Sequence, residues 1–117
     1  MSIAKGKTTP CYAVGCLREV EMGPAIIAYL EKIDATLAPF DGHFLIHGGP
    51  KHLLEGDFDD DLIVIGFPDR AHAEAWYRSA AYQSILPLRR DHSRGDIFLI
   101  EGVDADHVAT DVLGNGS

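Results

Sequence analysis

Two short segments of the sequence, Leu62–Phe67 and Ile97–Ile100, contain no polar side chain at any position. Their length and their β-branched and aromatic residues predict strands. Successive side chains of a strand point to opposite faces of its sheet, and a face that meets water is expected to be polar. The sheet of this protein must therefore be covered on both faces.

The first third of the chain predicts a strand followed by a helix. Cys11–Leu17 is apolar and uncharged, which favours a strand. Gly23-Pro24 marks the start of a helix because proline fits the first helical turn, and Pro39 marks its end. Apolar residues between these points recur at intervals of four, three and four residues, as on one helical face: Ile26, Leu30, Ile33 and Leu37.

The middle of the chain predicts a hairpin and a second helical region. His43–His47 is expected to form a strand that breaks at a glycine pair and resumes over His52–Glu55. Asp69 is the expected N-cap of a helix that runs to about Ser79, and a shorter helical piece follows over Tyr82–Arg90. The two segments without polar side chains supply the remaining strands.

The resulting order, βαββαβ, is the ferredoxin-like pattern of the α+β class, a four-stranded antiparallel sheet with two helices on one face. Two helices cover only one face, so the second apolar face needs another partner. We expect a homodimer in which the same sheet of a second copy packs against it about a two-fold axis. The alternative is that the C-terminal segment, with Val108, Val112 and Leu113, folds back over the open face.

The 117 residues are enough to bury one core without metals or disulfides. Residues 11–104 are expected to form the domain. Residues 1–10 are expected to be a flexible N-terminal tail, and residues 105–117 a C-terminal extension whose end is flexible.

Charge and cysteine content exclude several partners. The chain carries 18 acidic and 10 basic side chains, a formal net charge of −8 with histidines neutral. Such a surface lacks the basic face that binds nucleic acid, and an anionic membrane repels it.

Cys11 and Cys16 are an odd number of positions apart on one strand, so they point to opposite faces and cannot pair. With no disulfide and no signal peptide, the expected location is the cytoplasm.

Six histidines in so short a chain raise the question of a metal site. His43 and His47 have the spacing of two zinc ligands on a helix, but the glycines around them favour a strand. On a regular strand their rings would share a face about 13 Å apart, too far for one ion. The acidic turn that begins at Asp57 has Leu62 and Pro68 where a calcium loop needs glycine and glutamate. No metal is therefore expected.

The segment between positions 76 and 89 contains the only tryptophan, two of the four tyrosines and, after a proline, Arg89. Arg89 is suited to pair with a carboxylate, Tyr82 to donate a hydrogen bond and Trp76 to form an apolar wall. The structural alternative is that Trp76 belongs to the core, that Tyr82 ties a loop, and that Arg89 pairs with Glu55 or Glu101.

From about Tyr12 to Val103 the sequence resembles the DUF1330 family of uncharacterised proteins. The resemblance rests on a series of spaced motifs: Phe44-Leu-Ile-His-Gly-Gly-Pro50, Leu54-Glu-Gly56, Ile65-Gly-Phe-Pro68, Ala75-Trp-Tyr77, Ser79, Tyr82-Gln83, Pro87-Leu-Arg89 and Glu101-Gly102. It implies a subunit of the dimeric α+β barrel superfamily, whose sheets pack face to face. Members of that superfamily include cofactor-free monooxygenases, muconolactone isomerase-like enzymes and haem enzymes, which use the cavity between sheet and helices.

The sequence departs from the family pattern near this cavity. Where relatives usually have basic residues, this chain has His43 and His47, and where they usually have a glutamate it has Gly66. A cleft that binds an anion through basic groups would then bind it better as the imidazoles become charged.

Two functions follow from these observations. The first is a homodimer with a ligand-sized cleft in each subunit, a cofactor-independent enzyme acting on a small organic acid or aromatic metabolite. His47 would transfer protons and Arg89 would hold a carboxylate, with Trp76, Tyr82 and His43 completing the binding site. The second is a non-enzymatic small-molecule-binding or stress-response module. For an enzyme we expect His47 and Arg89 to converge within about 8 to 10 Å on a cavity of about 300 Å³ or more. A structural role predicts instead that these side chains are separated or fully paired.

Overall fold

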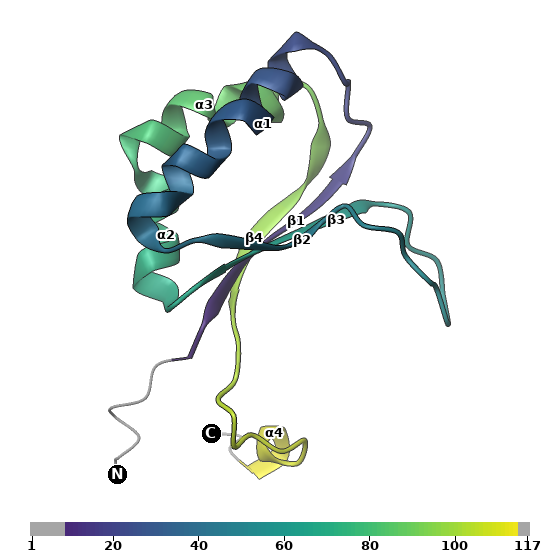
Figure 1. Ribbon diagram of the computed structural model, residues 1–117. Coiled ribbons are helices and arrows are strands. Elements are labelled where there is room, and N and C mark those ends of the chain that lie inside the picture. The colour runs from purple at the N-terminus through teal and green to yellow at the C-terminus, as the bar shows by residue number, and fades with distance from the viewer. Residues whose placement is uncertain (1–8, 115–117) are drawn as a thin grey trace.

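Four antiparallel strands form one sheet in the order β2-β3-β1-β4 (Figure 1). The structure, a computed structural model, describes residues 9–114. The strands are β1 (Cys11–Arg18), β2 (His43–His47), β3 (Asp61–Phe67) and β4 (Arg94–Glu101). The helices are α1 (Pro24–Leu37), the 3₁₀ turn η2 (Ala38–Phe40), α2 (Arg70–Arg78), α3 (Ala80–Arg90) and the short α4 (Asp111–Gly114). The ferredoxin-like order predicted from the sequence is confirmed.

Helices α1, α2 and α3 lie on one face of the sheet (Figure 1). Helix α1 begins at Pro24 and ends before Pro39, as its sequence signals predict. Its buried side includes Ile26 and Ile33, but Tyr29 is buried where the spacing predicted Leu30, which is 40% exposed. Within residues 9–114, no helix has the length and apolar character needed to cross a membrane.

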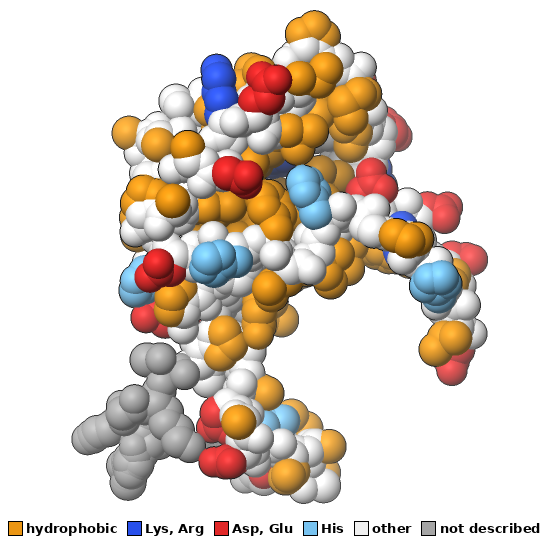
Figure 2. Space-filling view, viewed as in Figure 1, with side chains coloured by type: hydrophobic (Ala, Val, Ile, Leu, Met, Phe, Trp, Pro, Cys, Tyr) orange, Lys and Arg blue, Asp and Glu red, His pale blue; other side chains and the backbone are white. Residues whose placement is uncertain are grey.

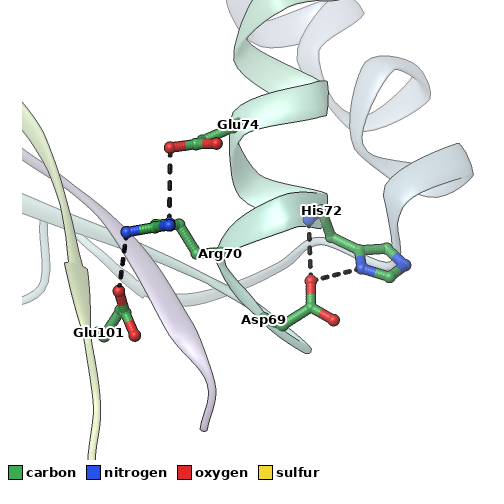
Figure 3. Close-up of polar contacts among 5 residues, drawn as sticks. All are labelled: Asp69, Arg70, His72, Glu74 and Glu101. Carbon is green, nitrogen blue, oxygen red and sulfur yellow. Dashed lines mark hydrogen bonds and ion pairs between the residues drawn. The ribbon is translucent and has the colours of Figure 1, made fainter. Parts of the chain in front are cut away.

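Polar contacts fix the start of α2 (Figure 3). Asp69 is the N-cap predicted from the sequence, and its carboxylate accepts hydrogen bonds from the His72 backbone N–H at 2.9 Å and from His72 Nδ1 at 2.7 Å. These hydrogen bonds hold the pKa of Asp69 below its usual value, so the cap stays ionised near neutral pH. Arg70 lies 3.3 Å from Glu101 on β4 and 3.6 Å from Glu74 one turn away, which ties the helix to the sheet.

Residues 48–60 form an exposed arm that leaves the sheet between β2 and β3 (Figure 1). The predicted continuation of the strand over His52–Glu55 is wrong, because no strand lies beside these residues to pair with them. Gly48 turns the chain with a φ of 68°. Pro50 has no backbone N–H to donate to a neighbouring strand. Leu54, at 93% exposure, shows how little of the arm the rest of the chain covers.

A bulge at Leu45 reverses the direction of the side chains along β2. His43 lies opposite Gly66, on the face away from the helices, whereas His47 lies opposite Ile63, on the face beneath them. The expectation that the two imidazoles share a face is therefore wrong. Strict alternation would place them together, but the extra residue moves His47 to the other side.

The two faces of the sheet differ in solvent exposure. Beneath the helices, Ala13, Ile65 and Phe67 belong to the core and are at most 5% exposed. On the other face, Phe98 and Ile100 of β4 are 45% and 53% exposed. The strands therefore have the second apolar face that their sequence predicts, and residues 9–114 do not cover it.

The C-terminal segment does not cover that face. Val108, Val112 and Leu113 are between 58% and 76% exposed, and α4 lies away from the sheet in Figure 1. The alternative in which this segment folds back over the sheet is thus not what the chain adopts. Pro10 is held at the end of the sheet where this segment leaves β4, since its carbonyl accepts a hydrogen bond from the Gly102 backbone N–H at 2.8 Å. The flexible ends predicted within residues 1–8 and 115–117 lie outside the described residues.

Cys11 and Cys16 are both free. Cys11 is buried beneath the helices, and Cys16, at odd spacing on the same strand, points to the opposite face.

Gly95 provides a test of the sheet geometry. It has a φ of 156°, and a Cβ there would overlap the carbonyl oxygen of Cys16 on the neighbouring strand. We expect Gly95→Ala to lower the free energy of unfolding by about 2–4 kcal/mol in urea denaturation. Gly49→Ala is the matched control, because nothing lies within 4 Å of its added methyl group. Equal stability of the two variants would contradict the β1–β4 register.

Candidate ligand-binding cavity

A cavity of about 260 Å³ lies between the helical layer and the sheet. Its walls are mainly apolar side chains of α1 and of the sheet, among them Ile26, Ile33, Phe44, Ile63, Ile65 and Ile97. Figure 2 shows the orange apolar side chains in this recess, with a pale blue histidine at its edge. This volume is slightly below the roughly 300 Å³ expected of an enzyme from the sequence, which is also the lower limit for cavities that hold drug-sized ligands, so this cavity fits a smaller molecule.

Four of the five residues singled out in the sequence line this cavity: His47, Trp76, Tyr82 and Arg89. His43 does not, because the bulge in β2 turns it to the opposite face of the sheet. Residues from β2, α2 and α3, distant in the chain, thus meet in one place because α2 and α3 both pack on the sheet face to which His47 points.

Tyr82 is the centre of the polar contacts in the cavity. Its side chain is only 2% exposed. Its hydroxyl lies 2.8 Å from the hydroxyl of Tyr29 on α1. Arg89, two turns further along α3, donates to the same hydroxyl from Nη2 at 3.4 Å. The guanidinium carbon of Arg89 also lies 5.8 Å from the centre of the Tyr29 ring, within the range of a cation–π contact.

Arg89 is buried without a carboxylate partner. The side chain is 9% exposed, and within residues 9–114 no Asp or Glu oxygen lies within 4.0 Å of its guanidinium. Glu101, which the sequence offered as a partner, pairs with Arg70 instead. Glu55 lies on the exposed arm and forms no ion pair with Arg89. Because an arginine stays charged in proteins and a buried charge is costly without an opposite charge, this position favours an anion in the cavity.

The free polar groups around Arg89 are hydrogen-bond donors. The two tyrosine hydroxyls share one hydrogen bond, so one of their two hydrogens has no acceptor within residues 9–114. Burial raises the pKa of Tyr29 far above its ordinary value, so this hydroxyl stays protonated. Arg89 has five N–H groups, and the hydroxyls of Tyr82 and Tyr29 engage at most two of them. A surplus of donors beside an apolar wall suits a ligand with an anionic oxygen.

Trp76 belongs to the core and also lines the cavity. Its indole N–H donates to Thr36 Oγ1 at 2.9 Å, which satisfies the buried donor. Its ring packs 4.2 Å from that of Tyr82 and 5.4 Å from that of Phe67. The core interpretation of Trp76 is thus correct, and the same ring forms part of the cavity wall.

Sequence reasoning missed two further polar residues of the cavity, Tyr29 and Asp61. Tyr29 could have been found, because Ile26, Tyr29 and Ile33 also follow a helical spacing of three and four residues. Asp61 reads as the end of an acidic turn, and only the register of β3 places it on the helix-facing side. The stacking of His47 on Phe44, with ring centres 4.4 Å apart, follows from the bulge and had no sequence signal.

A family model described as a domain of unknown function, DUF1330, matches residues 10–103 of the chain. No curated protein matches the sequence.

Solved structures share the fold at low sequence identity. A protein of unknown function from Rhodopseudomonas palustris aligns with a TM-score of 0.61 and 16% identity, over 84% of this chain and 85% of the other. A dimeric ferredoxin-like protein of unknown function from Jannaschia sp. CCS1 gives a TM-score of 0.60 and 16% identity, over 81% and 99%. SnoaB, a cofactor-independent oxygenase from Streptomyces nogalater, gives 0.55 and 17%, over 84% and 97%.

The stability of an Arg89 variant tests whether this side chain is structural. If the guanidinium lacks an opposite charge, Arg89→Met should leave the free energy of unfolding unchanged or raise it by up to about 2 kcal/mol in carboxylate-free buffer. Arg70→Met is the matched control, since Arg70 does have carboxylate partners and should show a small loss. A loss above about 2 kcal/mol in Arg89→Met, measured by urea denaturation, would mean that Arg89 holds the fold together.

Proposed function

This chain belongs to the DUF1330 family, and we propose that it binds a small organic acid with an aromatic or similarly apolar body in the cavity beneath its helices. The observation that carries the proposal is Arg89, a buried cation with no carboxylate partner in residues 9–114, at the wall of an apolar cavity. A ligand carboxylate would supply the missing charge through two parallel hydrogen bonds. The apolar body of the ligand would lie against the aliphatic and aromatic walls.

Each cavity residue has a role in this proposal. Arg89 holds the carboxylate, and the free hydroxyl hydrogen of the Tyr29–Tyr82 pair donates to the same group. Trp76 provides a flat apolar surface. His47, which lines the same cavity, is the group that we assign to proton transfer.

Proton transfer by His47 would make the protein a cofactor-independent enzyme. SnoaB, described as a cofactor-independent oxygenase, shows that this fold can support such chemistry, although the likeness extends to the fold alone. The second function is binding without turnover, as in a stress-response module. It is favoured by the Tyr29–Tyr82–Arg89 cluster, which explains binding without requiring any reacting group.

We further propose that the protein is a homodimer through its open sheet face. Phe98 and Ile100 are large apolar side chains about half exposed on that face, and residues 9–114 contain no segment that covers them. A second copy of the same face is the partner that a two-fold axis supplies. The Jannaschia protein with this fold is described as dimeric.

The expected compartment is the cytoplasm, and nucleic acid is not an expected partner. Two free cysteines fit a reducing environment, and a formal net charge of −8 opposes binding to a phosphate backbone.

Binding of benzoate tests the proposed ligand class. We expect wild-type protein to bind benzoate more tightly than benzamide, which has the same shape without the charge, in calorimetric titrations. Arg89→Gln should weaken benzoate binding by at least about 10-fold because it removes the charged hydrogen bonds. Arg90→Gln is the matched control, since Arg90 is adjacent in sequence, exposed and absent from the cavity wall. Equal binding of benzoate by both variants would overturn the proposal.

The dimer has a separate test. We expect wild-type protein to sediment at twice the chain mass of 12.7 kDa at micromolar concentration. Phe98→Glu should shift it to the monomer because it buries a charge in the interface. Ile27→Glu makes the same change on the exposed side of α1, where Ile27 is 48% exposed, and should leave the dimer intact. A monomeric wild-type protein would contradict the proposed interface.

A further inference from the structure

Asp61 places a second charge in the cavity. It is the first residue of β3 and pairs with Leu17 on β1. Alternation along β3 puts it on the same face as Ile63 and Ile65, the face beneath the helices. Asp61 is one of the residues that line the cavity, and it is exposed, so it lies on the solvent side of the wall.

The carboxylate of Asp61 is not neutralised by Arg18, the basic residue that ends β1. Arg18 lies on the opposite face, where it contacts Asp60 at 2.7 Å and Asp96 at 3.6 Å. No Lys or Arg nitrogen within residues 9–114 lies within 4.0 Å of Asp61, Arg89 included. The cavity therefore contains one cation and one anion that face the same space without touching.

A ligand in the cavity interacts with the charges of both Arg89 and Asp61. A carboxylate held at Arg89 leaves the rest of the molecule in an apolar cavity under the negative field of Asp61. A second carboxylate would be repelled by Asp61 and would lose its hydration against apolar walls. A neutral second group meets neither cost, and an ammonium group would be attracted.

We propose that Asp61 determines specificity at this site: with Arg89 it selects acids with one carboxylate whose second group is neutral or cationic, and it rejects dicarboxylates. The inference rests on the proposed binding of an acid at Arg89. It adds the class of acid and the residue that discriminates.

Three ligands of similar shape that differ in the charge opposite their carboxylate test this proposal. They are 4-nitrobenzoate, terephthalate and 4-(aminomethyl)benzoate, whose groups opposite the carboxylate are neutral, anionic and cationic. The titrations are made in low salt, because exposed charges are screened by salt. They are made at pH 8, above the range in which imidazoles ordinarily gain a proton. We expect terephthalate to bind at least about 5-fold more weakly than 4-nitrobenzoate, and 4-(aminomethyl)benzoate to bind as tightly or more tightly.

Two variants assign the effect to Asp61. In Asp61→Asn the ratio between 4-nitrobenzoate and terephthalate affinities should shrink on the order of 5-fold, because terephthalate gains more from the loss of the negative charge. Asp59→Asn removes the same charge from the arm, away from the cavity wall, and should keep the wild-type ratio.

The outcomes distinguish this inference from the proposed function. If 4-nitrobenzoate binds and depends on Arg89, but terephthalate binds as tightly or the ratio is the same in Asp61→Asn, then the role of Asp61 is refuted alone. If none of the three acids binds, or if Arg89→Gln binds 4-nitrobenzoate as wild type does, the proposed function fails and this inference fails with it.

Discussion

The contact between Tyr82 and its neighbours joins the helices to one another and shapes the cavity beneath them. The hydroxyl connects α3 to Tyr29 of α1, and the ring packs on Trp76 of α2 at 4.2 Å. Trp76 in turn donates to Thr36 of α1 and packs on Phe67 of the sheet. Because all three helices meet in this cluster, a change at Tyr82 would alter the cavity wall and the packing of the layer together.

Arg89 is a buried charge, unlike the buried polar groups that have hydrogen-bond partners within the fold. The indole of Trp76 has its acceptor, and the start of α2 has its cap and ion pairs. The guanidinium has tyrosine hydroxyls and a ring face but no opposite charge in residues 9–114. A buried group that stabilises the fold normally has its partner within the fold. We therefore propose that a ligand supplies the opposite charge, and that Asp61 on the same cavity limits which ligand binds.

Much of this architecture could be predicted from the sequence, for identifiable physical reasons. The helix limits followed from Pro24, Pro39 and Asp69, whose backbone and capping preferences act locally. The uncovered sheet face followed from strands with no polar position. What could not be predicted depended on pairing between distant segments: the bulge at Leu45 separated His43 from His47, and the register of β3 placed Asp61 in the cavity. Such features depend on hydrogen-bond partners that local sequence does not specify.

The central claim is that Arg89 binds the carboxylate of a ligand. It is tested most directly by a crystal structure of the protein with 4-bromobenzoate. The bromine scatters anomalously, so its position is independent of the interpretation of weak density. The account predicts one bromine site per subunit inside the cavity, with the carboxylate against the guanidinium of Arg89 and within reach of the tyrosine hydroxyls. A bromine found only outside the cavity, or an Arg89 side chain paired with a carboxylate of the protein itself, would contradict it.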